Sequence, residues 1–387
     1  MQITRIKVAN LYGLHNYDIL FNNEACLKII HAPNGYGKTT ILRLIKEILE
    51  GDYHALYVVP FDRFTIVFDS QEELEVLKDE ELIYRFTSLS KSDDYLVNRD
   101  LTGERLVDLE ERLKNIRKKM PIYLIDASRL WIERRNDKNE TRNLLPTVLE
   151  YARELSEQMR EALAEANYYG QELDRSFPTR LMQSIQNENE RCLTIKEIEE
   201  GLKELEATRA ILQGTGLYSR SLSQSDHILE SVSEVSDIMR KVLTLYLSDS
   251  KEKLKPFEEL TTKIHLLCEL INKRFAYKVM EVNMKDGFVF QLPNHQTLKA
   301  DKLSSGEQNE LILMFRLLFK SPNNAMILID EPEISLHIAW QQSFLEDMEA
   351  IARISNIRML IATHSPDIIN GRWDLTSDLE EVICEPI

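Results

Sequence analysis

The 387-residue sequence has no run of about 18 uncharged apolar residues, the length that a helix needs to cross a membrane. Its first residues, Met1 to Val8, alternate apolar and polar side chains like a β-strand. They lack the charged-then-apolar order of a signal peptide. The sequence also has no low-complexity tract and no repeat of fixed period. We therefore expect a globular, cytoplasmic protein that makes no use of a membrane.

Cysteine is scarce as well. The four cysteines are widely spaced, without a CxxC pair and without a histidine at the spacing of metal ligands. This pattern suggests neither a disulfide framework nor a zinc site, and it favours reduced, mostly buried thiols in the cytosol. The four are Cys26, Cys192, Cys268 and Cys384.

An excess of positive charge is also missing. The chain has 48 Lys and Arg against 64 Asp and Glu, a formal net charge of −16. This balance argues against a protein that coats nucleic acid by bulk electrostatic attraction. Residues 112–142 differ, because they hold ten Lys and Arg and four acids. A phosphate-contacting surface and a merely solvated charged face both fit this segment.

Both ends of the chain are typical of an α/β fold. Short β-branched runs predict buried strands at residues 27–31, 122–126, 326–329 and 359–363. A further pair of strands, 277–282 and 288–292, is joined by residues that end in Asp-Gly, which makes a hairpin plausible.

The middle of the chain is different. Apolar residues recur at alternating spacings of three and four over 148–166, 195–205, 228–246 and 257–271. Such seams predict helices that pack at small crossing angles. Each seam lasts two or three heptads, so we expect a short arm or a compact coiled-coil-like bundle. Helix breaks are expected at Phe177-Pro178 and at 214–216, and Pro256 is expected to begin the last helix.

The predicted organisation is an α/β domain that is split in sequence by a mainly helical insertion. Residues 1–130 form its N-terminal part and residues 276–387 its C-terminal part. The insertion covers residues 131–275.

A phosphate-binding loop follows the strand at 27–31. Residues 32–39 match the P-loop pattern G-x-x-x-x-G-K-[ST], with its first glycine replaced by Ala32, and a helix is predicted from 39 to 49. Gly35 and Gly37 let backbone N–H groups turn toward phosphate oxygens, beside the positive helix N-terminus. Lys38 supplies a charge for the β- and γ-phosphates, and the Thr39 hydroxyl is the expected Mg²⁺ ligand.

An ordinary Gly-rich turn before a helix is the alternative, and the strand–loop–helix order favours the phosphate site. Ala32 fits the loop if its backbone φ is negative. The predicted nucleotide-binding residues of this loop are Asn34, Gly35, Tyr36, Gly37, Lys38, Thr39 and Thr40.

A second candidate segment is the apolar strand at 326–330, which ends in Asp330 and Glu331. A buried strand would deliver Asp330 to the Mg²⁺ shell beside the P-loop. Glu331 would then orient the attacking water or accept its proton. Alone, the pattern would equally fit a solvated acidic turn; next to a P-loop it favours catalysis.

Two helix- and strand-end motifs complete the set. Leu303-Ser304-Ser305-Gly306-Glu307-Gln308 precedes an apolar helix at 311–319, and a hydroxyl-capped helix N-terminus is a phosphate site. An ordinary N-cap is the alternative. His364 follows the strand at 359–363, where it could donate to a terminal phosphate or serve a structural role.

Together these motifs resemble the nucleotide-binding domain of ABC ATPases. The P-loop, the LSSGE signature, the Walker B sequence ILIDEPE, the D-loop at 333–337 and the switch histidine appear in that family's order. Ser304 precedes Asp330 by 26 residues, and Asp330 precedes His364 by 34.

The resemblance implies that ATP and Mg²⁺ are bound between two copies of the chain. Residues Ser304 to Glu307 of one copy would complete the ATP site of the other. Lys38, Glu331 and His364 would be catalytic, with His364 contacting the γ-phosphate of its own copy.

The 266 residues between Lys38 and Ser304 exceed the spacing in transporter domains and resemble the SMC, RecF and OLD branch. Residues 174–181 and 334–341 resemble small OLD-like ATPases, several of which serve antiviral systems such as Septu, PARIS and retrons. This resemblance implies a slow ATPase whose dimer, or a higher oligomer, regulates an effector. Only 23 residues follow His364, so we expect a nuclease or toxin to come from a partner.

The sequence departs from the family at the Q-loop, because Ser128 stands where glutamine is expected. Three other functions are alternatives. A DNA repair or DNA-clamping ATPase of the RecF type would use residues 112–142 for phosphate contacts. The long insertion argues against a transporter motor, and the retained Lys38, Asp330, Glu331 and His364 argue against a scaffold without turnover.

Overall fold

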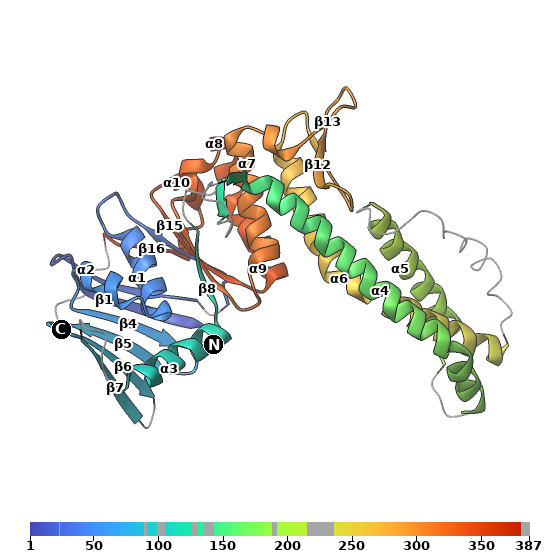
Figure 1. The fold of residues 1–387 in the computed structure, drawn as a ribbon, viewed down its shortest axis with the longest axis horizontal. Helices are drawn as coiled ribbons and strands as arrows, with labels where there is room; N and C mark the ends of the chain where they lie inside the picture. Colours follow the sequence, from blue (N-terminus) through green and yellow to red (C-terminus); the bar gives the residue numbers. More distant parts are fainter. Residues whose placement is uncertain are drawn as a thin grey trace. The chain divides into compact units, whose positions relative to one another are not determined.

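The computed structural model describes the chain except residues 23, 89–90, 99–104, 126–130, 135–142, 188–191, 215–235 and 381–387 (Figure 1). Contacts between residues divide the chain into two units. The first unit is Met1–Leu130 with Ile312–Ile387, and the second is Trp131–Leu311. Residues 276–311 therefore group with the helical segment. Within the described residues, no helix is long and apolar enough to cross a membrane.

The first unit contains a five-stranded sheet in which all neighbouring strands are parallel. Its order is β16 (Thr376–Asp378), β3 (Leu27–His31), β15 (Arg358–Thr363), β14 (Met326–Asp330) and β8 (Ile122–Ile125). The four strands that the sequence predicts lie in this sheet with boundaries shifted by at most one residue. Because the strands are parallel, the residues that follow β3, β14 and β15 meet at one edge of the sheet.

A six-stranded antiparallel sheet is the other layer of the first unit. Its order is β2 (His15–Leu20), β1 (Ile3–Leu11), β4 (Arg63–Phe68), β5 (Glu73–Lys78), β6 (Leu82–Ser88) and β7 (Lys91–Val97). Helix α1 (Lys38–Glu50) has seven buried side chains, and one hydrophobic core joins it to residues of both sheets. The P-loop is thus fixed to a rigid, fully packed helix.

Two further helices of the first unit are longer than two turns, α3 (Leu106–Lys119) and α9 (Phe344–Ser355). The other helices described in this unit are short: α2 (Tyr53–Val58), η5 (Arg316–Lys320), η6 (Pro332–Ser335), α8 (Ile338–Gln341), α10 (Pro366–Ile369) and η7 (Trp373–Leu375). Helix α7 (Ser305–Phe315) begins in the second unit and ends in the first, and it continues into the π-helical turn η5. The helix predicted at 311–319 therefore begins six residues earlier.

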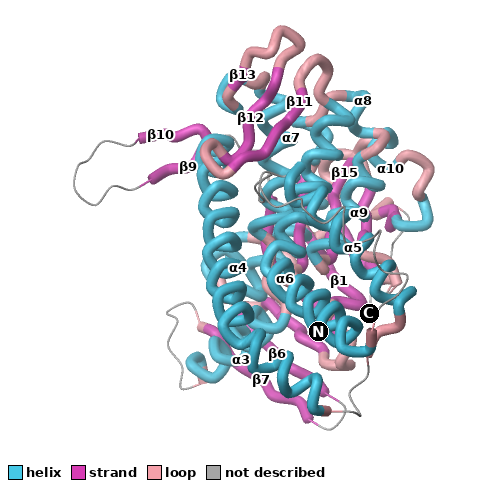
Figure 2. The backbone as a smooth tube through the Cα atoms, turned by 90° about the vertical axis from the view of Figure 1, so that its right-hand side faces the viewer, coloured by secondary structure: helices cyan, strands magenta, loops and turns pink. Residues whose placement is uncertain are grey.

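Within the described residues, the second unit contains three long helices and two small sheets, which Figure 2 shows. The helices are α4 (Thr147–Gln186), α5 (Ile195–Gly214) and α6 (Asp237–Arg274). Strands β9 (Trp131–Arg134) and β10 (Asn143–Pro146) form a hairpin, and β11 (Val279–Asn283), β12 (Gly287–Gln291) and β13 (Thr297–Leu298) form a three-stranded sheet before η4 (Ala300–Lys302). The hairpin predicted around Asp286-Gly287 is confirmed.

Helices α4 and α6 run antiparallel and side by side, as Figure 1 shows. Arg180 of α4 forms an ion pair with Asp249 of α6 at 2.5 Å, and Asp174 accepts from Lys253 at 2.5 Å. Helix α4 has 40 residues, which at about 1.5 Å per residue makes it about 60 Å long. The helices are therefore longer than the apolar seams alone indicated.

Two expected helix breaks are wrong. Pro178 lies inside α4 and Pro256 lies inside α6. A proline removes one backbone N–H and disturbs the preceding turn. Near Pro178, two polar side chains also bind the helix backbone, since the Leu173 carbonyl accepts from Ser176 Oγ at 3.2 Å and from Arg180 Nη2 at 2.9 Å. Packing between the long helices then keeps α4 continuous.

The β11–β12 hairpin lies directly against α4. A Cβ on Gly287 would lie 1.7 Å from the carbonyl oxygen of Ala152, and Gly287 has φ +72°. The Met284 carbonyl accepts from Ser156 Oγ at 2.7 Å and from Arg160 at 3.0 Å. Only glycine permits this approach, which anchors the hairpin to the first half of α4.

The three described cysteines, Cys26, Cys192 and Cys268, form no disulfide and are partly buried. Burial raises the pKa of Cys268 to about 11 and also raises that of Cys26. They are less buried than the sequence suggested, and the raised pKa values make these two thiols unreactive. Cys384 lies outside the described residues.

Candidate functional site

The P-loop connects β3 to α1 at the carboxyl edge of the parallel sheet. Gly35 and Gly37 have φ of +95° and +78°, in the left-handed region that favours glycine. Gly37 is the N-cap residue of α1 and has no side chain, so the first-turn N–H groups remain available to a phosphate. Ala32 does not have a positive φ, which meets the condition set for this substitution. Asn34 is exposed in the turn.

Lys38 is 4% exposed, and its ammonium folds back onto the loop. It donates to the carbonyl of Ala32 at 2.7 Å and to that of Pro33 at 3.0 Å. Burial lowers the pKa of Lys38, while the charges of Glu331 and two neighbouring acids raise it. An ammonium has three hydrogens, so these two bonds leave one for a phosphate oxygen.

Thr39 and Asp330 meet although 291 positions separate them. The Thr39 hydroxyl donates to Asp330 Oδ1 at 3.0 Å. Burial raises the pKa of Asp330, and the Thr39 hydrogen bond opposes this shift. A hydroxyl and a carboxylate are the hard oxygen ligands that Mg²⁺ prefers. Among the described residues, no cluster of three or more His, Cys, Asp or Glu could hold a metal ion.

Glu331 follows Asp330 with φ +44°, a backbone conformation that costs a non-glycine residue about 1–3 kcal/mol. Its N–H donates to the Ala362 carbonyl at 2.9 Å, which ties the end of β14 to β15. Its Oε1 lies 3.7 Å from His364 Nδ1, and the two side chains are 24% and 44% exposed. The two predicted catalytic groups are therefore neighbours on a strained, partly open edge.

Glu333 lies beside His364, although the sequence indicated it only as the first residue of the D-loop. Its Oε1 accepts from the Thr363 hydroxyl at 2.7 Å and from the His364 N–H at 2.9 Å. Its side chain is 7% exposed, and Oε1 also lies 3.1 Å from His364 Nδ1. The sequence shows Glu333 as the third acid at the end of the strand at 326–330, but only the fold shows which groups it contacts.

Three aromatic residues near the P-loop, Tyr12, His15 and Tyr17, were not predicted, whereas Tyr36 of the loop was. Tyr12, in the β1–β2 turn, is 45% exposed, and its hydroxyl lies 2.9 Å from Thr40 Oγ1. The His15 ring lies 5.6 Å from the Tyr17 ring and 5.5 Å from the Tyr36 ring, centre to centre. Tyr17 also donates to the Tyr36 carbonyl at 2.8 Å. The exposed ring of Tyr12 is suited to stacking on a purine base, and no sequence spacing connects this turn to the loop.

The signature residues lie at the start of α7 in the second unit. Ser304 and Glu307 form a reciprocal cap: the Ser304 N–H and hydroxyl both donate to Glu307 Oε2 at 2.9 Å, and the Glu307 N–H donates to Ser304 Oγ at 3.4 Å. Lys278 holds the same carboxylate at 2.5 Å. Burial favours the neutral acid, but these bonds from Lys278 and Ser304 hold the pKa of Glu307 below its usual value. Ser305 is exposed and Gly306 partly so.

The basic segment 112–142 is described only in part, and Ser128 lies outside the described residues. Within α3, Arg112 pairs with Asp93 at 2.6 Å, and Arg117 donates to the carbonyls of Leu49 and Glu50 at the end of α1. These two arginines connect α3 to β7 and to the end of α1. Three exposed lysines of α3 face solvent: Lys114, Lys118 and Lys119.

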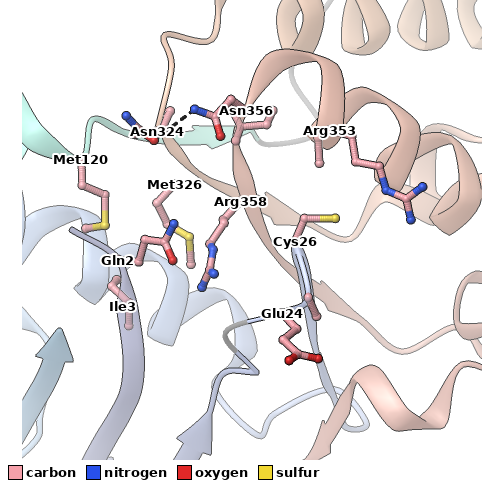
Figure 3. Close-up of a pocket in the computed structure, with 14 residues that line it drawn as sticks. Gln2, Ile3, Glu24, Cys26, Met120, Asn324, Met326, Arg353, Asn356 and Arg358 are labelled. Carbon is pink, nitrogen blue, oxygen red and sulfur yellow. Dashed lines mark hydrogen bonds between the residues drawn. The ribbon is translucent and has the colours of Figure 1, made fainter. Parts of the chain in front are cut away.

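A cavity of about 220 Å³ lies at the opposite edge of the parallel sheet, where its strands begin (Figure 3). Cys26, Met326 and Arg358 line it just before or at the start of β3, β14 and β15. Asn324 and Asn356 hydrogen-bond each other at 3.2 Å beside it. The P-loop, Asp330 and His364 follow the other ends of these strands, so this cavity is separate from the candidate site.

The geometry agrees with a comparison of the sequence with known families. A family model described as "AAA ATPase domain" (AAA_15) matches residues 1–369. The chain belongs to this family. The prediction of an ABC-type ATPase of the SMC, RecF and OLD branch is confirmed.

The chain is similar to the retron Ec83 probable ATPase of Escherichia coli, with 23% identity over 195 residues. The matched region is 48% of this chain and 34% of that protein, so it spans about a third of the relative's length.

Among solved structures, the chain is similar to two heads of SMC proteins. One is the Smc head domain with an extended coiled coil bound to the C-terminal domain of ScpA, from Pyrococcus furiosus, with 16% identity and a TM-score of 0.40 over 95% of this chain and 90% of the other. The second is the SMC head domain from Thermotoga maritima, with 12% identity and a TM-score of 0.38 over 96% and 92%.

Proposed function

We propose that this ATPase binds Mg-ATP at the P-loop edge of the first unit and hydrolyses it there. The observation that carries the proposal is the 3.0 Å hydrogen bond from Thr39 to Asp330, which joins the two predicted Mg²⁺ ligands. Lys38 and the uncapped first turn of α1 bind the phosphates. The exposed ring of Tyr12 contacts the adenine base of ATP.

Each remaining group has a separate role in this proposal. A bound Mg²⁺ neutralises charge on the β- and γ-phosphates. Glu331, 24% exposed and next to Asp330, orients the attacking water and accepts its proton. His364 donates to an oxygen of the γ-phosphate, over whose oxygens the charge is spread in the transition state.

The proposal includes a dimer in which Ser304, Ser305 and Gly306 of one copy reach the γ-phosphate bound by the other. Support comes from their position at the N-terminus of α7, with both serines exposed. A helix N-terminus with small side chains fits an anion. Nucleotide-dependent pairing would then change the arrangement of the helical units.

We also propose that this switch regulates a nuclease or toxin supplied by another protein in antiviral defence. The support is the likeness to a relative named as a retron ATPase, over a third of that relative's length. Turnover would be slow, since in such a switch the bound state has to last.

The test combines phosphate release with nucleotide binding in a Glu331→Gln variant. A general base contributes about 100- to 10,000-fold to a rate, so the variant should lose hydrolysis to that extent. It should still bind Mg-ATP and should form a longer-lived dimer in size-exclusion chromatography. Glu349→Gln is the matched control, since Glu349 lies on α9, away from the P-loop edge, is 21% exposed and pairs with Arg372. Wild-type hydrolysis by Glu331→Gln would remove Glu331 from the mechanism.

The same assay separates the candidate partners. Strong stimulation of phosphate release by double-stranded DNA at low salt would favour the DNA-clamping alternative. A slow rate that is indifferent to DNA would favour regulation of a protein effector.

A further inference from the structure

Three acids follow one another within four positions at the end of β14, and they make different contacts. Asp330 accepts from Thr39, and Glu331 faces the partly exposed edge. Glu333 turns toward the end of β15 instead, where its Oε1 accepts from the Thr363 hydroxyl and the His364 N–H. The third acid therefore contacts the chain around His364 and not the metal ligands.

The environment of Glu333 is unusual for a carboxylate. The side chain is 7% exposed, and its Oε2 is buried without a hydrogen-bond partner among the described residues. Burying a carboxylate oxygen without a partner is costly, so such a residue calls for an explanation beyond stability. No Lys or Arg ion pair to Glu333 occurs within the described residues. The imidazole of His364 is the charge-bearing group that it contacts.

We propose that Glu333 is a positioning residue that sets the orientation and tautomer of His364 through two points of attachment. The His364 backbone N–H donates to Glu333 Oε1 at 2.9 Å, and ring Nδ1 lies 3.1 Å from the same oxygen. A carboxylate can only accept, so Nδ1 must carry a hydrogen for this contact to be a hydrogen bond. Nε2 is then the ring nitrogen that faces the phosphate, and it donates to a phosphate oxygen only when the imidazole carries a second hydrogen there.

Glu331 is less suited to this role. Its Oε1 lies 3.7 Å from Nδ1, beyond hydrogen-bond distance, and it makes no contact with the His364 backbone that the structure records. The Thr363 hydroxyl extends the support: it donates to Glu333 and accepts from the Ser365 N–H at 3.0 Å. A carboxylate that holds a histidine in this way orients the ring and selects its tautomer.

This inference rests on the proposed role of His364 in ATP hydrolysis. The first test is Glu333→Gln, which keeps the size of the side chain and removes its charge. We expect kcat for phosphate release to fall about 10- to 100-fold, the usual cost of losing a histidine-orienting partner, with KM for ATP unchanged. Glu349→Gln, matched in chemistry and placed on α9, should keep the wild-type kcat.

A double-mutant cycle shows whether Glu333 acts through His364. In a His364→Ala background, Glu333→Gln should have no further effect, because two residues that act as one unit are not additive. The same fold-loss in both backgrounds would overturn the proposal, and so would a wild-type kcat in Glu333→Gln.

The second test needs no activity, and its wild-type measurement needs no altered Glu333. In protein with ¹⁵N-labelled histidine rings, the His364 signals are identified among the eight histidines by their loss in His364→Asn. We expect the neutral ring to carry its hydrogen on Nδ1 in the wild type and on Nε2 in Glu333→Gln. A hydrogen on Nε2 in the wild type would refute the positioning role even if Glu333→Gln fails to fold. A wild type without ATP hydrolysis but with the Nδ1 tautomer would refute the proposed function and leave the positioning role standing.

Discussion

Replacing Thr39 by valine should weaken the binding of Mg-ATP without weakening that of metal-free ATP. Valine has the shape of threonine and lacks the hydroxyl that bonds Asp330 at 3.0 Å. The same hydroxyl is a predicted Mg²⁺ ligand, and a polar contact with a charged group is worth about 1.5–3 kcal/mol. Since 1.4 kcal/mol is tenfold in an equilibrium constant, Mg-ATP should bind about 10- to 150-fold more weakly.

The same change should alter the pH dependence of binding. Burial already raises the pKa of Asp330, and the Thr39 hydrogen bond opposes that shift. Without the hydroxyl the pKa of Asp330 rises further. Because a protonated Asp330 does not bind Mg²⁺, affinity for Mg-ATP should be lost at a higher pH in the variant as the solution is acidified.

Titration calorimetry with ATP, in Mg²⁺ and in EDTA, measures both effects. Thr39→Ser keeps the hydroxyl and should bind Mg-ATP like the wild type. If Thr39→Val bound Mg-ATP with wild-type affinity, the hydrogen bond to Asp330 would not mark a metal site, and the reasoning from this contact would be wrong.

Three further outcomes are expected. Asp330→Asn removes a carboxylate whose charged form is disfavoured by burial. At pH 7 the nucleotide-free variant should therefore unfold at a higher temperature than the wild type, although it should not retain Mg-ATP. A lower melting temperature would contradict this. Gly287→Ala should destabilise the second unit by more than about 3 kcal/mol, since the new Cβ would overlap an α4 carbonyl. Gly170→Ala inside α4 has its nearest neighbouring atom 4.0 Å away and should stabilise the unit by up to about 1 kcal/mol. Chemical denaturation followed by circular dichroism compares the two variants. If DNA binds, Lys118→Glu with Lys119→Glu should weaken it in a salt-dependent binding assay, and unchanged affinity would exclude α3 as the contact.

Local pattern was sufficient where one segment decides its own structure. The β-branched run at Leu27–His31 became β3 without a change of boundary, because a short apolar strand between breakers has few alternatives. The two glycines of the P-loop adopt positive φ, as the loop pattern requires. The Asp286-Gly287 turn likewise specified its hairpin.

Local pattern failed where a neighbouring element compensates for a poor sequence. Pro178 and Pro256 read as helix breakers, yet both lie inside long helices. The antiparallel packing of α4 and α6, with ion pairs such as Arg180–Asp249, outweighs the backbone hydrogen bond that each proline removes. Helix propensity is a weak predictor once tertiary contacts are available.

The sequence by itself determined the candidate residues of the proposed site, because the P-loop glycines, a lysine, paired acids and a strand-end histidine are properties of short segments. Only the tertiary structure decided which of them work together. Parallel strands bring Thr39 beside Asp330 across 291 positions, and the turn after β14 directs Glu333 onto His364 rather than toward the metal ligands. Such contacts depend on register between strands and on side-chain direction, and neither is encoded in the spacing of residues along the chain.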